Sequence, residues 1–261
     1  MKNVMEKSMN WYNFIKQSMP LPKSTGIPEV PDDPRFEDWG KHNWYTVDLL
    51  ERNLADPSGL EEKYPDLQYL GSGAYGVAYD IMQNAEQSGH VLKVTKDISE
   101  WTSGNRIMEL QNQLGGQLPN IATIYDVQKL QDETDDPDKP YDVYAIEVEQ
   151  AEQLAQVPNE LVGFLRWFFT IHLRYLRGNP QEVAPKAWDF ILEKAPNNYG
   201  KGAEEKLKSF EPIFADVFSK YFDMASTLVD MGFSISDSHG DNVGIRHGTE
   251  EYVIFDFGEM A

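Results

Sequence analysis

The feature that most constrains this chain is the stretch 235–258, close to its C-terminal end. Asp237 is followed five positions later by Asn242, and the stretch closes with the tripeptide Asp256–Gly258. Two short apolar runs separate Asn242 from Asp256, and each has the length and composition of a β-strand: 243–245 and 252–255. A turn near His247 would fold the two runs into a hairpin. The sequence therefore predicts that Asn242 and Asp256 are neighbours in space.

The side chains at the ends of this hairpin indicate a magnesium site beside a separate carboxylate. An amide oxygen and a carboxylate held side by side suit Mg²⁺, which prefers hard oxygen ligands and is commonly bound together with phosphates. Asp237, five residues before Asn242, could orient an attacking hydroxyl group. We therefore expect the rest of the chain to supply a nucleotide site.

A glycine-rich turn between two predicted strands, within residues 67–81, is the first candidate for that site. Gly71, Gly73 and Gly76 lack a Cβ, so backbone N–H groups there can approach a phosphate closely. The spacing is a weak signal by itself, because a plain hairpin turn would show it as well. Its strand–turn–strand context argues against a dinucleotide site, where a helix follows the turn.

A lysine in the next predicted strand, residues 90–95, is the second candidate. Lys93 lies among apolar neighbours, and a strand lysine is usually on a solvated face unless a phosphate site precedes it. A helix is predicted over 99–114 and ended by glycines, and Glu109 borders its apolar stripe. We expect Glu109 to reach Lys93, and we regard Glu100 as too close in sequence to do so. The alternative for Glu109 is an exposed helical position.

The remaining pattern predicts an α+β protein. Two further strands, 121–130 and 141–148, flank an acidic loop at 132–138, and helices are predicted over 161–176 and 210–231. Prolines make 178–209 irregular in this interpretation. Residues 1–64 show no clean period and form an N-terminal arm without an assigned function.

Composition limits the classes of partner. The chain of 261 residues has a formal net charge of −20, which argues against broad nucleic-acid binding and makes basic partners plausible. Simple solubility is the plainer explanation of that charge. There are no cysteines, which excludes disulfides and fits a cytoplasmic protein. No apolar run of about 18 residues and no signal-peptide pattern is present, so we expect no membrane contact.

Taken in order, the glycine loop, strand lysine, helix glutamate, Asp–Asn pair and Asp-Phe-Gly resemble the protein kinase superfamily over residues 67–258. The resemblance implies a two-lobed kinase-like fold, with an antiparallel sheet and one helix in 65–150 and a minimal helical lobe in 151–261. It implies ATP and Mg²⁺ as ligands. The roles it implies are as follows: the glycines of the loop and Lys93 at the phosphates, Glu109 holding Lys93, Asn242 and Asp256 on Mg²⁺, Asp237 as catalytic base, and Ala78, Val91, Val148, Glu149 and Ala151 around the adenine.

Two departures from the usual kinase pattern shape the expected activity. Ile235 and Ser236 stand where the superfamily usually has His-Arg before the catalytic aspartate, and the chain ends three residues after Gly258. The series Asp237-x-His239-x-x-Asn242 and the segment 118–128 are similar to compact phage and bacterial serine/threonine kinases. These features imply a kinase that is competent without a regulatory loop, in the host cytoplasm if the source is a phage.

Three alternatives stay open at this point. His239-Gly240-Asp241 is similar to the His-Gly-Asp of antibiotic phosphotransferases, in which the aspartate is the base and an asparagine follows five residues later. Arg246 occupies that later position and has no oxygen for a metal, which favours Asp237 as the base. The acceptor could be a protein Ser or Thr or a small molecule. The chain could also be an inactive pseudokinase that binds a basic partner.

Overall fold

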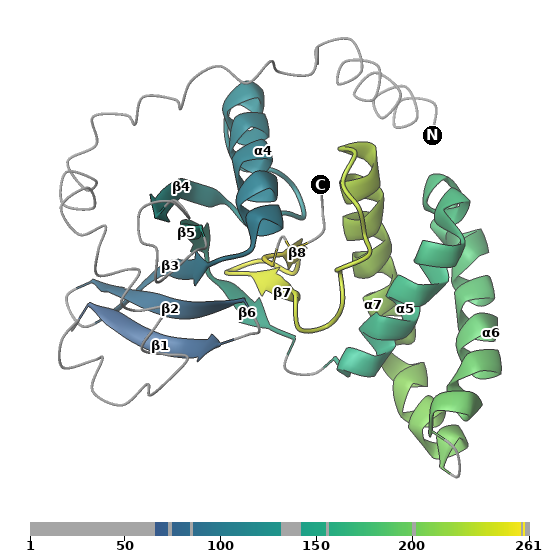
Figure 1. The fold of residues 1–261 in the computed structure, drawn as a ribbon. Coiled ribbons are helices and arrows are strands. Elements are labelled where there is room, and N and C mark those ends of the chain that lie inside the picture. The colour runs from purple at the N-terminus through teal and green to yellow at the C-terminus, as the bar shows by residue number, and fades with distance from the viewer. Residues whose placement is uncertain are drawn as a thin grey trace.

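The computed structural model describes residues 66–72, 75–83, 86–131, 142–154, 157–199, 202–256 and 258. Within them the protein is α+β: a five-stranded antiparallel sheet, a second sheet of three strands, and four α-helices. Figure 1 shows the five-stranded sheet and α4 on one side, the helices α5, α6 and α7 on the other, and the small sheet between them. The predicted arm, 1–64, and the acidic loop, 132–138, lie outside the described residues.

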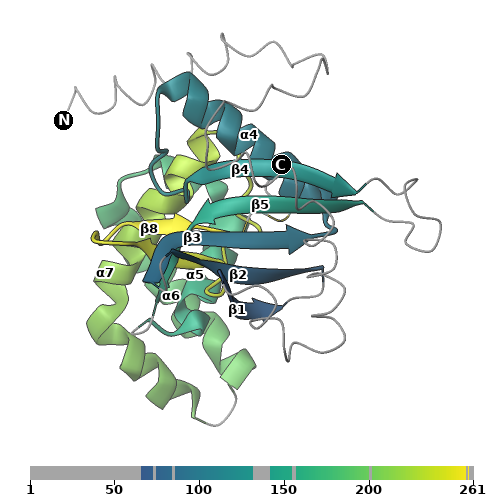
Figure 2. The ribbon, with the colours of Figure 1, turned by 90° about the vertical axis from the view of Figure 1, so that its left-hand side faces the viewer.

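The larger sheet has the strand order β1-β2-β3-β5-β4, and Figure 2 shows its strands side by side. Its strands are β1 (Leu67–Ser72), β2 (Gly76–Gln83), β3 (Glu86–Thr95), β4 (Ile124–Gln131) and β5 (Val143–Glu149). The predicted strands are confirmed, with shifts of a few residues at their ends. Because side chains alternate between the faces of a strand, directly paired residues share a face. Ala78 pairs with Lys93 and Lys93 pairs with Ile146, so these three side chains lie on one face.

Helix α4 (Ile98–Leu114) begins almost directly after β3 and packs against β4 and β5 on that same face. Asp97 caps its start by accepting a hydrogen bond from the backbone N–H of Ser99 at 2.8 Å. Gly115 ends the helix with φ of 80°, a left-handed conformation that glycine adopts without a steric penalty. Close packing on the sheet depends on Gly104, where an added Cβ would lie 3.3 Å from Val127.

The helical part consists of α5 (Asn159–Ile171), the short 3₁₀ helix η2 (Leu173–Arg177), α6 (Pro180–Tyr199) and α7 (Ala203–Asp230). Aromatic side chains fill the space between these helices. Phe169 contacts Phe218, Tyr221 and Phe222 of α7 through ring centroids 5.8–6.1 Å apart. The periodic apolar stripe predicted for the last helix is confirmed, and the helix starts seven residues earlier than predicted.

The prediction of an irregular segment at 178–209 was wrong, because α6 occupies most of it. Pro180 begins the helix, where a missing backbone N–H removes no hydrogen bond. The helix continues through Pro185 because it buries one apolar face against its neighbours, as shown by Val183, Ala187, Ile191 and Ala195. The predicted helix 161–176 also ends early, at Ile171, and η2 follows it.

The small sheet joins the two parts of the fold. It has the order β6-β7-β8, with β6 (Ala151–Gln153), β7 (Val243–Arg246) and β8 (Tyr252–Ile254). β6 directly follows β5, while β7 and β8 form the predicted hairpin near the end of the chain. Within the part of the chain that the structure describes, no helix is long and apolar enough to cross a membrane.

Candidate active site

A cleft of about 1280 Å³ runs between the larger sheet and the β6-β7-β8 sheet. Most of the residues expected around a nucleotide line it. Those that line the cleft are Gly71, Gly76, Ala78, Val91, Lys93, Val148, Glu149, Ala151 and Asp256. Gly73 lies outside the described residues. Residues from distant parts of the sequence therefore meet in one cavity.

Lys93 lies on the wall of this cleft between two carboxylates. Its Nζ donates a hydrogen bond to Asp256 Oδ1 at 2.8 Å and forms an ion pair with Glu100 Oε2 at 2.9 Å. Asp256 lies 163 residues further along the chain, so this contact bridges the sheet and the end of the β7–β8 hairpin. The Lys93–Glu100 contact is an ion pair without hydrogen-bond geometry. We call these three residues the Lys93 cluster.

The expected Lys93–Glu109 pair was wrong, because Glu100 takes the position predicted for Glu109. Only Lys96 and Asp97 separate β3 from α4, so the first turn of the helix lies beside Lys93. Glu109 follows Glu100 by nine residues, about two and a half helical turns, and therefore lies on the opposite side of α4. Its side chain is exposed. A short connection can thus place residues close in sequence into direct contact.

Burial and opposite charge act together on the ionisation of the cluster. Burial raises the pKa of Glu100 to about 7, although the neighbouring Lys93 ammonium acts to lower it. For Lys93, burial favours the neutral amine, but the carboxylates of Glu100 and Asp256 outweigh it and raise its pKa. Lys93 therefore stays a cation at neutral pH, where Glu100 is close to its point of half-protonation.

The β7–β8 hairpin brings Asn242 and Asp256 together. Val243 pairs with Ile254, and the Phe255 N–H donates to the Asn242 carbonyl at 3.1 Å, so Asn242 lies beside the residue that precedes Asp256. Asn242 is buried, and its Nδ2 donates to the Asp237 carbonyl at 3.0 Å. That bond fixes the amide orientation. Among the described residues no hydrogen bond engages its Oδ1, which is the atom that could bind a cation.

Asp237 and Asp241 differ in their surroundings. The Asp237 side chain is 25% exposed, against 76% for Asp241. Asp237 Oδ2 lies 3.2 Å from where a Cβ on Gly258 would be, so Gly258 lies close to the Asp237 side chain. Asp241 lines the cleft and accepts a hydrogen bond from Asn159 Nδ2 at 2.7 Å. His239 lies between them, 3.5 Å from Asp237 and 3.7 Å from Asp241.

Residues 148–151, which join the two parts of the fold, were expected around the adenine. Two of their backbone N–H groups are already hydrogen-bonded within the protein. Val148 is buried and lines the cleft as predicted. The N–H groups of Glu149 and Gln150 are already donated to the carbonyls of Thr123 and Gly89, both at 2.8 Å. In this structure those two donors are therefore engaged within the protein. Recognition of a base by this segment would depend on its other backbone groups.

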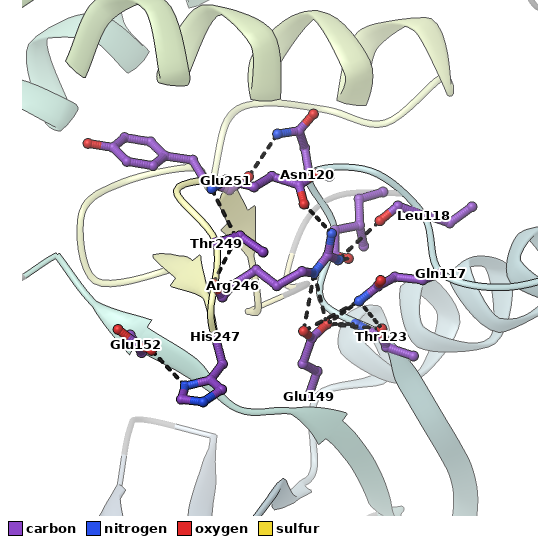
Figure 3. A network of polar contacts seen from close by, with 12 residues as sticks. Gln117, Leu118, Asn120, Thr123, Glu149, Glu152, Arg246, His247, Thr249 and Glu251 are labelled. Atoms are coloured by element: carbon purple, nitrogen blue, oxygen red, sulfur yellow. Dashed lines mark hydrogen bonds and ion pairs between the residues drawn. The ribbon is translucent and has the colours of Figure 1, made fainter. Parts of the chain in front are cut away.

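Arg246, which sequence reasoning considered only as a failed metal ligand, is the centre of a buried polar network (Figure 3). Its Nε donates to Glu149 at 3.1 Å, and its Nη1 forms an ion pair with Glu251. Its Nη2 donates to the carbonyls of Leu118 and Ile121 at 3.1 and 2.6 Å. The signal that the sequence offered for Arg246 was its position as a charged residue at the end of a short apolar strand. The partners could not be found from sequence, because they come from three separate segments.

The acidic ends of this network are themselves well satisfied. Glu149 Oε2 accepts hydrogen bonds from the backbone N–H and the hydroxyl of Thr123, both at 2.9 Å. Burial acts to raise the pKa of Glu149, but these hydrogen bonds and the Arg246 guanidinium outweigh it and lower that pKa. Glu251 Oε1 accepts from the backbone N–H of Asn120 at 2.7 Å. Glu149 therefore remains ionised at neutral pH.

The residues of the cleft fit a metal that is bound together with phosphates. The described residues contain no group of three His, Asp or Glu side chains able to hold a metal by themselves. Asp256 lines the cleft, whereas the buried Asn242 is not among the residues that line it and lies beside Phe255 in the hairpin. Their side chains offer two hard oxygen donors, and Mg²⁺ commonly takes few protein ligands and completes its shell with phosphate and water. Such a pair suits Mg²⁺ with a nucleotide better than a metal held by the protein alone.

Comparison with protein-family models and with curated proteins gave no match to this chain.

Proposed function

We propose that the protein is an ATP-dependent phosphotransferase, a kinase that modifies Ser or Thr hydroxyls of protein substrates. In this proposal the larger sheet with α4 and the helical part with the β7–β8 hairpin are the two lobes of a minimal kinase-like fold. The ATP site is the cleft between them. The resemblance of the motif order to the protein kinase superfamily and the arrangement of the cleft residues both support this proposal.

The observation that carries the proposal is the Lys93 cluster together with Asn242. Lys93 lies between a helix carboxylate and a carboxylate from the far end of the chain, and Asn242 lies beside Phe255, the residue that precedes the latter. A purely structural cluster would have no need of the glycine turn or of the second, partly exposed aspartate, Asp237, close to it. The combination suits the binding of a polyphosphate next to an acceptor hydroxyl.

Each residue then has a chemical role in transfer. Lys93 would bind the α- and β-phosphates, with Glu100 and not Glu109 fixing its position. Mg²⁺ bound by Asn242 and Asp256 would neutralise charge on the β- and γ-phosphates. Asp237 would accept a hydrogen bond from the acceptor hydroxyl and take its proton as the oxygen bonds to the γ-phosphorus. The bond to the bridging oxygen breaks and ADP leaves.

The acidic character of the chain agrees with a basic protein acceptor. The net charge is −20, and Asp241 and Glu152 line the cleft with largely exposed side chains. Opposite charge on a substrate would speed its encounter with such a surface, in a manner that falls with ionic strength. The proposal therefore names a Ser or Thr flanked by Lys or Arg as the preferred acceptor.

The test is transfer of label from γ-labelled ATP in the presence of Mg²⁺ and a cell extract. We expect labelled protein bands in which phosphoserine or phosphothreonine is found, and no such bands with Asp256→Asn as a matched control for kinases in the extract. Label in a small metabolite alone would replace the protein acceptor by a small-molecule one. Absence of transferred label with wild-type protein would contradict phosphotransfer.

A further inference from the structure

The two sides of the cleft meet at the Arg246 network, which is far more extensive than a single strand pairing requires. Arg246 closes β7, Glu149 closes β5, and Leu118 and Ile121 belong to the connection between α4 and β4. One guanidinium thus binds the hairpin that carries Asn242, the segment that carries Val148, and the segment that follows α4. The hairpin and the Val148 segment both border the candidate nucleotide site.

Asn120 continues the network to the other end of the hairpin. Its backbone has φ of 60°, a left-handed conformation that only a few residue types adopt readily. Its Nδ2 donates to the Tyr252 carbonyl at 2.9 Å, and its Oδ1 accepts from Thr227 of α7, also at 2.9 Å. The Ile254 N–H donates to the Asn120 carbonyl, and the Ala122 N–H donates to the Ile254 carbonyl. The connection between α4 and β4 is therefore bound along β8, which ends two residues before Asp256.

The chemistry of Arg246 makes this junction rigid. A guanidinium is planar and presents its donors in a fixed fork, so partners on three segments must keep one relative orientation to be satisfied together. The side chain is 8% exposed, and the carboxylates it binds are themselves partly buried. Moving the hairpin away from the sheet would leave buried charged groups unpaired, which is strongly unfavourable.

We infer that Arg246 is a positioning residue, which holds Asn242 and Asp256 at a fixed distance from Lys93 through its contacts with Glu149, Glu251 and the 118–121 carbonyls. This inference rests on the proposed function, since it concerns the metal ligands of the same cleft. It assigns to one buried arginine the alignment of the two sides of the cleft.

The first experiment needs no nucleotide. Amide hydrogen exchange would be followed at Ala122 and Ile254, whose N–H groups bridge the 118–123 segment and β8, in wild type and in Arg246→Lys. Lysine keeps the charge but lacks the fork, so we expect exchange at these two amides to rise at least about tenfold, with β3 and α7 unchanged. Ile191→Ala, which truncates a fully buried side chain of α6, is the matched control for general loss of stability.

The second experiment measures Mg·ATP affinity and transfer in the same variants, at a temperature where each is folded. Mg²⁺ raises the affinity for ATP in the wild type, and Arg246→Lys should lose most of that gain, so that its affinity for Mg·ATP falls by about tenfold or more. The rate of transfer should fall on the order of 10²-fold. ATP affinity without Mg²⁺ should stay near wild type, because Lys93 is untouched. Ile191→Ala should keep the full Mg²⁺ effect.

Each outcome decides a separate point. Uniformly faster exchange in Arg246→Lys, as in Ile191→Ala, would overturn the inference and make Arg246 a general stability residue. Faster exchange at Ala122 and Ile254 with an unchanged Mg²⁺ effect would also overturn the inference, since the Arg246 contacts would then not fix the positions of Asn242 and Asp256. If wild type showed no Mg²⁺-dependent ATP binding, the proposed function would fail, while the exchange data would still decide whether Arg246 fixes the hairpin. Should Arg246→Lys not fold, Glu149→Gln removes the same contact more mildly.

Discussion

Two buried clusters of a cation with two carboxylates lie in this protein, and they differ in how completely they are satisfied. The Arg246 side chain is 8% exposed, and each of its three nitrogens has a partner. The Lys93 side chain is 20% exposed, and the Glu100 Oε2 beside it has the Lys93 ammonium, at 2.9 Å, as its one polar partner among the described residues. Structural clusters are usually saturated, and unsatisfied buried polar atoms gather at functional sites. The contrast agrees with the proposal that Lys93 binds a ligand, whereas the saturated Arg246 cluster holds elements of the fold together.

The largest effect is expected beside the unsaturated cluster, at Asp237. Asp237→Asn should retain Mg·ATP binding and slow transfer by roughly 10²–10⁴-fold, the range for a positioned general base. Asp241→Asn, on a largely exposed side chain of the same loop, should cost much less. Steady-state kinetics of the two purified variants measure the difference. The opposite order would move the base to Asp241 and disconnect Asp237 from the chemistry.

Removing the Lys93 cation should mainly lower transfer, whereas removing the Arg246 cation should mainly lower stability. Lys93→Ala should leave the fold nearly intact and lower transfer by ~10²-fold or more, the scale of a lost electrostatic stabiliser. Arg246→Met leaves buried carboxylates and carbonyls unpaired, so it should lower the free energy of unfolding by about 3–5 kcal/mol. Denaturant melts and transfer assays on both variants give the comparison. Equal stability losses would remove the distinction between a ligand cluster and a structural one.

A smaller effect separates the two glutamates of α4. Glu100→Gln keeps the shape but loses the charge of the ion pair with Lys93, and the loss of a buried charged partner of this kind should slow transfer roughly tenfold. Glu109→Gln is its matched control on the opposite side of the same helix and should be indistinguishable from wild type. Kinetics at saturating ATP would settle which glutamate acts. A loss confined to Glu109→Gln would contradict the geometry.

The smallest predicted effect is a pair of opposite pH dependences in the metal-free protein. The pKa of Glu149 is lowered below its ordinary value near 4.5, so its stabilisation is present above that pH and is lost as pH falls through the folded-state pKa. The pKa of Glu100 is raised to about 7, so between about 4.5 and 7 the folded state binds more protons than the unfolded state. The contribution of Glu100 therefore lowers the free energy of unfolding as pH rises through that window.

Two substitutions separate these contributions in urea melts across pH. Glu149→Gln should flatten the loss of stability on the acid side, and Glu100→Gln should flatten the decline towards neutral pH. Glu149→Gln should leave the decline towards neutral pH unchanged, and Glu100→Gln should leave the loss on the acid side unchanged. Parallel curves for all three proteins would show that neither carboxylate titrates as described.

The sequence predicted the elements whose signals are local. Short apolar runs identified the strands, the apolar period identified α7, and the glycines after Leu114 marked the end of α4. The hairpin between Asn242 and Asp256 followed from two short apolar runs and a turn. These features depend on neighbours in the chain, so a single sequence contains them.

What the sequence could not predict depends on tertiary packing. Glu100 was rejected as too near to Lys93 in sequence, although the predicted strand and helix left only three residues between them, because the packing of α4 on the Lys93 face of the sheet was not predicted. α6 was missed because burial of Val183, Ala187 and Ile191 outweighs the local cost of Pro185. The partners of Arg246 come from segments up to 128 residues away, and no local pattern encodes such a meeting.

The most direct test of the central claim is thermal unfolding of the wild-type protein with ATP, in the presence and absence of Mg²⁺. A ligand that binds only the folded state stabilises it by about 2.7 kcal/mol at a hundredfold excess over its Kd. We predict a clear rise in Tm with ATP and Mg²⁺ together, a smaller one with ATP alone, and loss of the Mg²⁺-dependent part in Asp256→Asn. No rise in Tm for wild type at millimolar Mg·ATP would contradict the account.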